Sequence, residues 1–568
     1  MKKLVYLTTI FAIMFTTSSC DQNLFPSDEL NSGALMNDEG GAAYIIDGCY
    51  AMLKEEYAYI EYESSNTYIR HYLMDAEFPA DNICLSGRTT DPLYQATCYK
   101  MTDNLKNVGL PWWIGYKVIY TCNNVIEGFE EGKSAECDQL LGEAYFLRAM
   151  VHFHFVTLFA KPYILGRDNM GVPLRTSTNT EVTTRATVGE VYDQVVKDLR
   201  KAATLMNKPR GNAGYASKNT ALGLLTRVYL YEEKNDSVIA VVDEMGGNPA
   251  SFLETADFPH YYAKALTSKE TLLAIAHTSL ENRGSGSIGS MYTNDGGGWG
   301  EIYASDPLLN LLERYPEDLR LSFIDFQEET SPSIVYTGKD CVFFPVKSED
   351  ATADFRSNLY AEVKTDASGK YCTIDGTDYR IKEVKVNGMN QPDAAGEYTL
   401  YFVNYGGEDC AARIIKFPVH RFTFPNYFVT KYSYQDGQPM LSSPVLLRWG
   451  EVVLNRAEAY AKLGKVNEAL DDVNAIRTRA GLSGTALFSA GNMHGYTDVL
   501  DVVLDERRME LCFEGHRMFD VYRNRRDMDR RYPGVQPWEV IKYTDDKIQF
   551  PIPYGEISVS GIPQNPGY

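Results

Sequence analysis

Two consecutive amphipathic segments at residues 446–479 constrain the fold of this chain most strongly. Small side chains recur in the first segment at Ala457, Ala459 and Ala461, and Gly464 separates it from the second segment. Apolar residues recur at helical spacing in both segments, which predicts two helices that each bury one face. Small residues let two helices cross closely, and a glycine permits a sharp reversal between them. We therefore predict a helix hairpin.

Further helical segments occur along the chain, most of them in pairs. They cover residues 113–129, 137–159, 188–206, 219–231 and 237–245. The segment at 188–206 is clearly amphipathic, with Val191, Val195 and Leu199 on one face. The hairpin at 446–479 resembles the tetratricopeptide helix-turn-helix, but the other pairs lack the regular period of that repeat. The predicted fold class is mainly α, a degenerate array of helix hairpins.

Residues 334–415 interrupt the helical pattern with strand-like sequence. Apolar and polar residues alternate over 379–386 directly before Asn387-Gly388, and over 398–404 before a pair of glycines. Alternation with a period of two, followed by a glycine-containing turn, is typical of β-hairpins. We expect a small β-rich insertion docked on a single helical body that spans residues 42–568.

The N-terminus has the features of an export signal. Two lysines precede an apolar stretch at residues 4–15, and four small residues separate this stretch from Cys20. The apolar stretch is too short for a permanent membrane span, so residues 1–19 are predicted to be a signal peptide. A cysteine at the cleavage point predicts a bacterial lipoprotein acylated at Cys20; the alternative is a secreted protein with an incidental cysteine. Residues 20–41, acidic and rich in turn formers, would then form a tether.

Charge excludes one class of partner. The formal net charge is −21 at pH 7, and such a surface repels phosphate backbones, so we expect no nucleic-acid ligand. Membrane attachment would come from acyl chains, because a basic patch is missing from so acidic a sequence. Beyond Cys20 the cysteines are odd in number and form no CxxC pair, which leaves disulfide pairing open.

Two motifs suggest cofactor or metal chemistry, and each fails a physical test. Residues 284–289 match GxGxxG, but loop sequence follows where a dinucleotide-binding site needs a helix. His152 and His154 lie two apart on a helical segment, so they point in different directions and cannot share a metal ion. The sequence therefore predicts no cofactor and no metal site.

The acidic cluster Glu506, Glu510 and Glu514 occupies one face of a predicted helix. A glycoside hydrolase needs two carboxylates that face each other across the substrate, whereas these three point the same way. Arginines interleave with them and would keep them ionised and paired. We predict a structural ion-pair network and no catalytic residues.

Aromatic residues are frequent, with 40 Tyr, 25 Phe and 5 Trp, and exposed aromatic rings stack well on sugar rings. The glycine-rich loop at residues 283–305 combines such rings with amide and carboxylate groups that can pair with hydroxyls. Its proposed ligand-binding residues are Tyr292, Asn294, Asp295, Trp299 and Tyr303. A second candidate segment contributes Asp81, Asn82, Arg88 and Tyr94. The alternative is that both are surface loops whose aromatic side chains tuck into the body.

Six segments, spread over nearly the whole chain, resemble the SusD/RagB family of outer-membrane nutrient-binding lipoproteins. They are WWIGYKVIYTCNNVI (112–126), LGEAYFLRAMVHFHFVTLFA (141–160), TVGEVYDQVVKDLRKA (187–202), LLRWGEVVLNRAEAYAKLGKVNEALDDVNAIRTRAGL (446–482), DERRMELCFEGHRMFDVYR (505–523) and FPIPYGEISVSGIPQNPGY (550–568). The resemblance implies a body of four tetratricopeptide-like hairpins, with loops and small strands on the ligand face. Most of these motifs belong to the scaffold, so the resemblance transfers no ligand residue.

The same resemblance implies a role at the cell surface. Members of this family bind nutrient fragments, usually glycans, as the lid of a SusC-like, TonB-dependent transporter on the outer face of the outer membrane. We therefore expect a non-enzymatic oligosaccharide-binding lid anchored through Cys20. Two alternatives stay open: the same scaffold could bind peptides, as in RagB-like relatives, or the protein could be a surface glycoside hydrolase.

Overall fold

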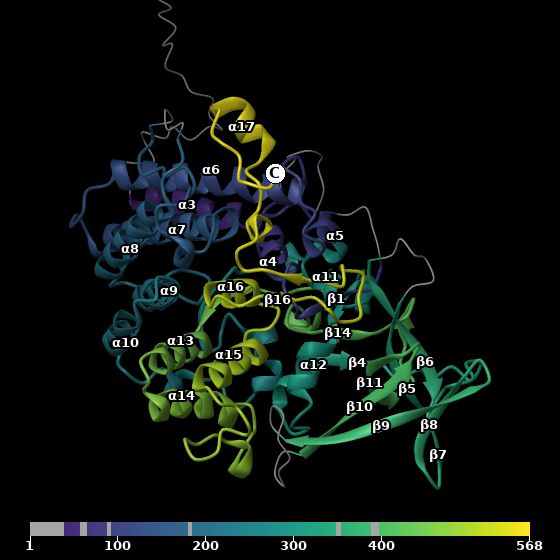
Figure 1. Ribbon diagram of the computed structural model, residues 1–568. Coiled ribbons are helices and arrows are strands. Elements are labelled where there is room, and N and C mark those ends of the chain that lie inside the picture. Colours follow the sequence, from purple (N-terminus) through teal and green to yellow (C-terminus); the bar gives the residue numbers. More distant parts are fainter. Residues whose placement is uncertain (1–38, 57–64, 88–91, 180–183, 348–353, 388–396) are drawn as a thin grey trace, which may run out of the picture.

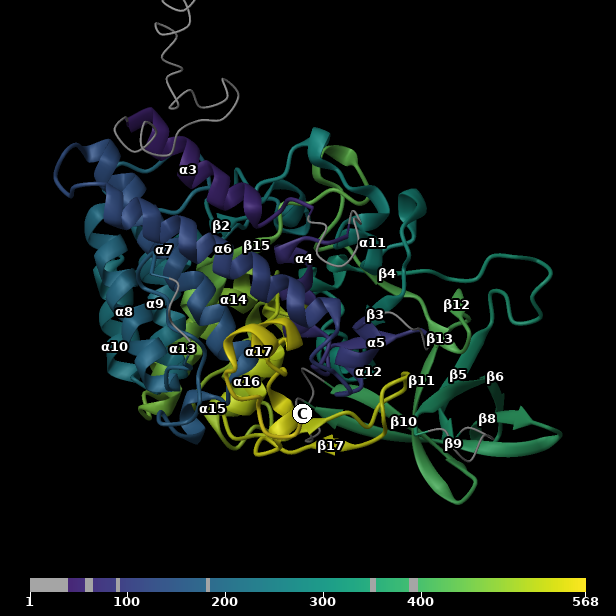
Figure 2. The same cartoon turned by 90° about the horizontal axis from the view of Figure 1, so that it is seen from above.

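The computed structural model describes residues 39–568, except for 57–64, 88–91, 180–183, 348–353 and 388–396. A body of helices occupies one side of the molecule and a sheet projects from the other (Figures 1 and 2). Cys20, the predicted signal peptide and all but the last three residues of the predicted tether lie outside the described residues. Within the described part of the chain, no helix has both the length and the apolarity that a bilayer span requires.

The N-terminal half of the body is a stack of helices in which α7 lies between α6 and α8. The elements are α3 (Glu39–Met52), α4 (Tyr68–Glu77), α6 (Lys106–Gly128), α7 (Ala135–Phe159), α8 (Val188–Leu205), α9 (Lys218–Tyr231) and α10 (Asn235–Glu244). Helix α7 is buried on nearly all sides, which explains why its sequence is apolar around its circumference. Thr187 and Glu190 form a capping box that begins α8. Helix α6 begins at Lys106, before the predicted residue 113, and contains Pro111.

The predicted hairpin at 446–479 forms helices α13 (Trp449–Lys462) and α14 (Val466–Arg479). Gly464 lies between them with φ at +72°, a conformation that only glycine adopts readily. Helix α13 packs against α9 and α10, so the hairpin extends the N-terminal stack although some 200 residues separate the segments in sequence. Figure 1 shows α9, α10, α13 and α14 together on one side of the body. The mainly α fold is thereby confirmed.

Short two-stranded pairings bring distant loops together. They are β1 (Ile83–Leu85) with β3 (Ile302–Ala304), β2 (Thr271–Ala274) with β15 (Val445–Arg448), β4 (Ile324–Phe326) with β14 (Tyr427–Val429), and β12 (His420–Arg421) with β13 (Phe424–Pro425). Helices α5 (Pro92–Thr97), α11 (Gly289–Tyr292), α12 (Asp306–Leu312), α15 (Val499–Glu510), α16 (Arg517–Arg523) and α17 (Tyr554–Ser560) complete the body. The β1–β3 ladder joins the two candidate segments predicted from the sequence, because β1 lies just after Asn82 in one and β3 lies at the end of the 283–305 loop.

The predicted β-rich insertion forms one antiparallel sheet of seven strands in the order β6-β5-β11-β10-β9-β8-β7. Its strands are β5 (Asp340–Lys347), β6 (Arg356–Glu362), β7 (Lys364–Asp366), β8 (Gly369–Ile374), β9 (Thr377–Asn387), β10 (Glu397–Tyr405) and β11 (Glu408–Lys416). Strand β9 ends at Asn387, where the Asn-Gly turn was predicted.

The two edges of this sheet meet, because only Val363 separates edge strand β6 from edge strand β7. The packing agrees: Ala361 on β6 and Cys372 on β8 belong to one buried cluster with Val342 and Val403. In a flat sheet with strands spaced about 4.8 Å apart, β6 and β8 would lie too far apart to share a core. The insertion is therefore a closed sheet with its own small hydrophobic core.

Candidate ligand-binding surface

The glycine-rich loop at 283–305 folds back on itself through short helical turns. Gly289 begins α11, which has only four residues. A Cβ atom at Gly289 would lie 2.3 Å from the main-chain oxygen of Tyr432, so only glycine fits this approach. The third glycine of the GxGxxG match thus serves close backbone packing, and the helix that follows is too short to hold a pyrophosphate.

Two of the predicted aromatic residues in this loop are buried. Tyr292 and Tyr303 are each 1% exposed. The ring of Tyr292 stacks on Tyr432 at 5.4 Å between centroids, and Tyr303 meets Phe428 edge-on at 5.4 Å. Both tyrosines therefore belong to the hydrophobic core and hold the loop in place; neither ring is available on the surface.

The other predicted residues of the loop do lie on the surface. Trp299 is 57% exposed, and its Nε1 donates a hydrogen bond to the main-chain oxygen of Ser285 at 3.0 Å. Asn294 and Asp295 are exposed, and Asp295 accepts a hydrogen bond from the hydroxyl of Tyr434 at 3.1 Å. The loop thus presents an anchored indole ring beside an amide and a carboxylate.

The hairpin of β12 and β13, which the sequence did not predict as part of a site, completes this surface. Arg421, at the end of β12, donates to the main-chain oxygen of Trp299 at 3.1 Å and to the Glu301 carboxylate at 3.2 Å. The next residue, Phe422, is 72% exposed and has φ of +56°. Its ring lies against the backbone of Gly87, across the β1–β3 ladder from the Trp299 loop. We call Trp299 and Phe422, with the polar residues Asp295, Glu301 and Arg421, the Trp299–Phe422 surface.

A sequence signal for Phe422 existed. The segment His420–Pro425 reads as two short strands around a tight turn, and such turns favour glycine, asparagine or aspartate. An aromatic residue in place of these turn formers was the available signal, and in the structure Phe422 has a positive φ and is exposed.

The second predicted segment is held within the body. Asp81 pairs with Arg517 at 2.7 Å and with Arg508 at 3.2 Å. Burial alone would raise the pKa of Asp81, but the two guanidinium groups outweigh it and hold the pKa well below its usual range. Asn82 is fully buried and accepts a hydrogen bond from Arg508 Nε at 2.9 Å. Tyr94 is half-buried on α5, and Arg88 lies outside the described residues. Asp81 and Asn82 therefore position the β1 segment and do not reach the surface.

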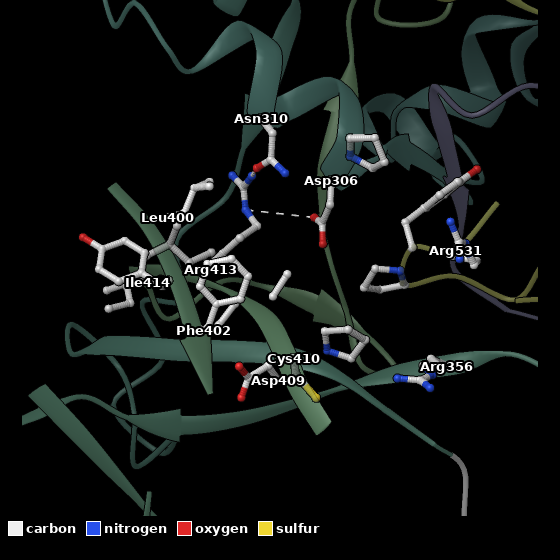
Figure 3. Close-up of a pocket in the computed structure, with 18 of the residues that line it drawn as sticks. Asp306, Asn310, Arg356, Leu400, Phe402, Asp409, Cys410, Arg413, Ile414 and Arg531 are labelled. Carbon is white, nitrogen blue, oxygen red and sulfur yellow. Dashed lines mark hydrogen bonds and ion pairs between the residues drawn. The ribbon is translucent and has the colours of Figure 1, made fainter. Parts of the chain in front are cut away.

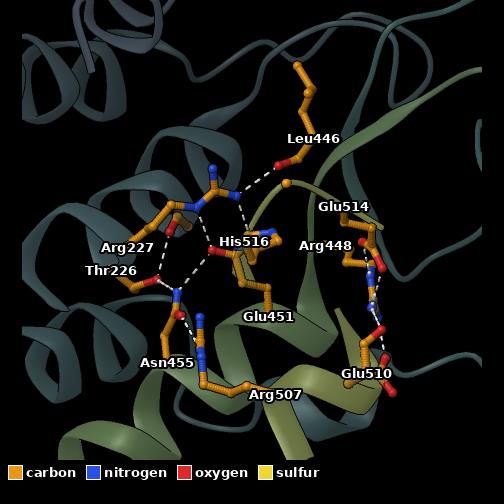
Figure 4. A network of polar contacts seen from close by, with 12 residues as sticks. Thr226, Arg227, Leu446, Arg448, Glu451, Asn455, Arg507, Glu510, Glu514 and His516 are labelled. Atoms are coloured by element: carbon orange, nitrogen blue, oxygen red, sulfur yellow. Dashed lines mark hydrogen bonds and ion pairs between the residues drawn. The ribbon is translucent and has the colours of Figure 1, made fainter. Parts of the chain in front are cut away.

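The predicted ion-pair network is buried, and Figure 4 shows the part of it in which Arg448 lies between Glu510 and Glu514. Glu506 pairs with Arg320 and Arg477, Glu510 with Arg448 and Arg479, and Glu514 with Arg448 and Lys431. The side chains of the three glutamates are between 1% and 5% exposed. Such buried carboxylates, each paired with two cations, cannot face each other across a substrate, so the prediction of a structural network is confirmed.

The neighbouring cations lower the pKa values of Glu510 and Glu514. Burial by itself would raise the pKa of Glu510, but the guanidinium groups of Arg479 and Arg448 outweigh burial and lower the pKa to about 2. Lys431 and Arg448 likewise hold the pKa of Glu514 well below its usual range against the effect of burial. These acids therefore stay ionised at neutral pH and link β15, α15 and the chain around residue 431.

Histidine and cysteine chemistry is also structural within the described residues. His152 and His154 are buried, and their Nδ1 atoms lie 3.0 Å from the Arg148 main-chain oxygen and 2.9 Å from the Tyr68 hydroxyl. Among the residues that the structure describes, no group of three His, Cys, Asp or Glu side chains is arranged to hold a metal ion. The nine cysteines beyond Cys20 are buried.

Known protein families and relatives resemble this chain over most of its length. Residues 275–568 match the model of the SusD family, and residues 29–230 match a related family described as starch-binding associating with outer membrane. Two SusD-like proteins of Formosa agariphila are 24% and 23% identical to this chain, covering 84% and 83% of it and 83% and 82% of their own lengths.

Solved structures agree with this assignment. A SusD superfamily protein of Bacteroides thetaiotaomicron superposes with a TM-score of 0.67 at 22% identity, covering 93% of this chain and 99% of the other. The surface glycan-binding protein A of Bacteroides uniformis has a TM-score of 0.60 at 16% identity, with coverage of 93% and 99%. Because one family model alone matches more than half of the chain, this protein belongs to the SusD family.

Proposed function

We propose that this protein captures glycans at the cell surface and delivers them, as a lid, to a SusC-like, TonB-dependent transporter. The observation that carries the proposal is the Trp299–Phe422 surface. It presents two exposed aromatic rings, 57% and 72% exposed, beside the side chains of Arg421, Glu301 and Asp295. Aromatic faces receive the CH groups of a sugar ring, while the polar side chains receive its hydroxyls.

Cys20 supports the location that we propose. An acyl chain on this residue would hold the protein in the outer membrane, facing the cell exterior, with the residues after it as a tether. A surface glycan-binding protein among the structural neighbours favours glycans over peptides as ligand. The acids Glu506, Glu510 and Glu514 are buried and paired with cations, so none of them is placed to attack or protonate a glycan; this supports binding without hydrolysis.

Binding of purified protein to glycan and peptide arrays tests the ligand class. Glycan binding without product release is expected, whereas peptide binding alone or enzymatic turnover would contradict the proposal. Affinity purification from native membranes tests the lid role, because a TonB-dependent transporter should then be recovered with the protein and identified by mass spectrometry.

Removing the indole ring tests the site. We expect Trp299→Ala and Phe422→Ala each to weaken glycan affinity about 10- to 100-fold, since burying an aromatic side chain contributes about 1.5–3 kcal/mol. Tyr120→Ala is a matched control, because it removes an exposed ring from α6. Unchanged affinity in the first two variants, or equal loss in the control, would place the site elsewhere.

A further inference from the structure

A cleft with a cavity volume of about 460 Å³ lies between the closed sheet and the helical body (Figure 3). One wall is formed by β10 and β11 and the other by α12 and the chain at 531–538. This volume is typical of ligand sites. Among the described residues, the lining of the cleft shares none with the Trp299–Phe422 surface. The cleft exists only because of the insertion, so it is a separate feature of this chain.

Contacts at both ends hold the two walls at a fixed separation. At one end Arg413 of β11 donates to Asn310 Oδ1 at 2.9 Å and to both carboxylate oxygens of Glu313 at 2.7 and 2.6 Å. At the other end the Gly534 amide donates to the Arg356 main-chain oxygen at 3.2 Å, and the Arg356 guanidinium lies 4.3 Å from the ring centre of Trp538. A cleft that is already open and braced requires little reorganisation to bind a ligand.

The chemistry of the lining is unusual for so acidic a protein. Leu400, Phe402 and Ala411 supply an apolar floor, and Figure 3 shows Arg413 on one side of the cleft and Arg356 and Arg531 on the other. Three carboxylates, Asp306, Glu313 and Asp409, also line the cleft. Glu313 is paired with Arg413, and Arg356 is paired with Glu408 at 2.9 Å. Arg531 is 53% exposed and pairs only with Asp529 among the described residues, which leaves part of its hydrogen-bonding capacity to solvent.

Arg413 carries the most direct indication of a missing acceptor. Its side chain is 10% exposed, and its Nε has no hydrogen-bond partner among the described residues. Asp306 Oδ1 lies 4.0 Å from this atom, beyond hydrogen-bond range. A buried donor without a partner costs free energy that an acceptor on a ligand would recover.

We propose that this cleft is a second ligand site, which binds an acidic segment of a glycan through carboxylate or sulfate groups. Guanidinium groups pair with both groups through charge-assisted, bidentate hydrogen bonds. The CH face of the same sugar packs on Phe402. The overall charge of −21 repels anions from the rest of the surface, so the gathered arginines select where an acidic chain binds. This inference rests on the proposed capture of glycans and adds the charge of the ligand.

Titration calorimetry on the purified protein tests the site with four probes of equal length: a uronate tetrasaccharide, a sulfated tetrasaccharide, a neutral tetrasaccharide and a glutamate tetrapeptide. The cleft variants are Arg531→Ala and Phe402→Ala, both of partly exposed residues. Arg525→Ala is the matched control, because this arginine is 48% exposed and also forms one surface ion pair. Trp299→Ala reports on the other surface.

We expect at least one acidic tetrasaccharide to bind, more weakly at high salt, and the uronate and sulfate probes identify which group is recognised. Each cleft variant should weaken this binding about tenfold or more, because each removes a charge-assisted contact or an apolar one. Arg525→Ala and Trp299→Ala should leave it unchanged.

Four results would overturn the inference. They are loss of acidic-glycan binding in Trp299→Ala but in neither cleft variant, loss in Arg525→Ala as large as in the cleft variants, acidic probes binding no better than the neutral one, and the tetrapeptide binding as well as the sugars. If only the neutral tetrasaccharide binds, the inference fails and the proposed glycan capture stands. If no glycan binds in this assay or on arrays, the proposed function fails as well.

Discussion

Arg448 offers the sharpest test of how the C-terminal half is held together. All three guanidinium nitrogens donate hydrogen bonds, to Glu270, Glu510 and Glu514, at distances of 2.5 to 3.0 Å. The side chain is 1% exposed, and the carboxylates that it contacts are at most 5% exposed. Arg448→Met keeps much of the apolar volume and removes the charge, so the acids are left with fewer cations in a medium of low dielectric constant.

The remaining partners set the size of the effect. After the substitution, Arg479 still pairs with Glu270 and Glu510, and Lys431 still pairs with Glu514. Arg320 also lies 3.8 Å from Glu510, but it and Arg477 already balance Asp318 and Glu506. Two remaining cations then face three buried carboxylates, where three cations had balanced them. Breaking a buried ion pair by removing one partner costs about 3–5 kcal/mol, because it leaves a charge uncompensated. We expect the free energy of unfolding to fall by about 4 kcal/mol.

Differential scanning calorimetry measures this loss, and we expect the midpoint of unfolding to drop by about 3–4 °C, because the unfolding entropy of so long a chain is large. Arg525→Met is the control, since it breaks a half-exposed pair with Glu233 that contributes at most about 1 kcal/mol. If Arg448→Met melts within about one degree of the unmodified protein, then the carboxylates are not held ionised by their arginines, and the structural interpretation of the network is refuted.

Three further predictions concern pH, a glycine and the anchor. Since Glu510 has a pKa of about 2 in the folded protein against an ordinary value of 4.5, its contribution of about 3 kcal/mol is complete above pH 4.5 and is lost as the pH falls toward 2. The midpoint of thermal unfolding should fall through this window, and a constant midpoint would contradict the assignment. Gly289→Ala should lower the unfolding midpoint and weaken ligand binding at Trp299, because its Cβ would lie 2.3 Å from Tyr432 O; Gly48→Ala, which meets nothing within 4 Å, should not. Cys20→Ala should release the protein from the membrane fraction, as immunoblotting of fractions would reveal, and persistent membrane association would exclude an acyl anchor on this residue.

Helical periodicity predicted much of the body correctly. The amphipathic segment at 188–206 became α8 (Val188–Leu205), and the hairpin around Gly464 became α13 and α14. The spacing of Glu506, Glu510 and Glu514 with neighbouring arginines predicted an ion network, although its partners Arg320 and Arg448 come from far along the chain. Period and spacing are local properties, so a single sequence displays them.

Loop residues were harder to place for a physical reason. Tyr292 and Trp299 occupy the same glycine-rich loop, yet one is 1% exposed and the other 57%. No local period distinguishes them, because a loop is buried or exposed according to what packs against it. Here Tyr432 covers Tyr292, and the hairpin of Phe422 reaches the loop from more than 100 residues away.

The sequence by itself determined the helix hairpins, the presence of a strand-rich insertion and the family resemblance, since each depends on patterns within short segments. Only the tertiary structure decided that the insertion closes into a sheet through Val363, that Arg413 meets α12 across a cleft, and which aromatic rings face solvent. These features depend on pairings between distant segments. Such pairings arise when a whole chain buries its apolar surface together, which no single segment encodes.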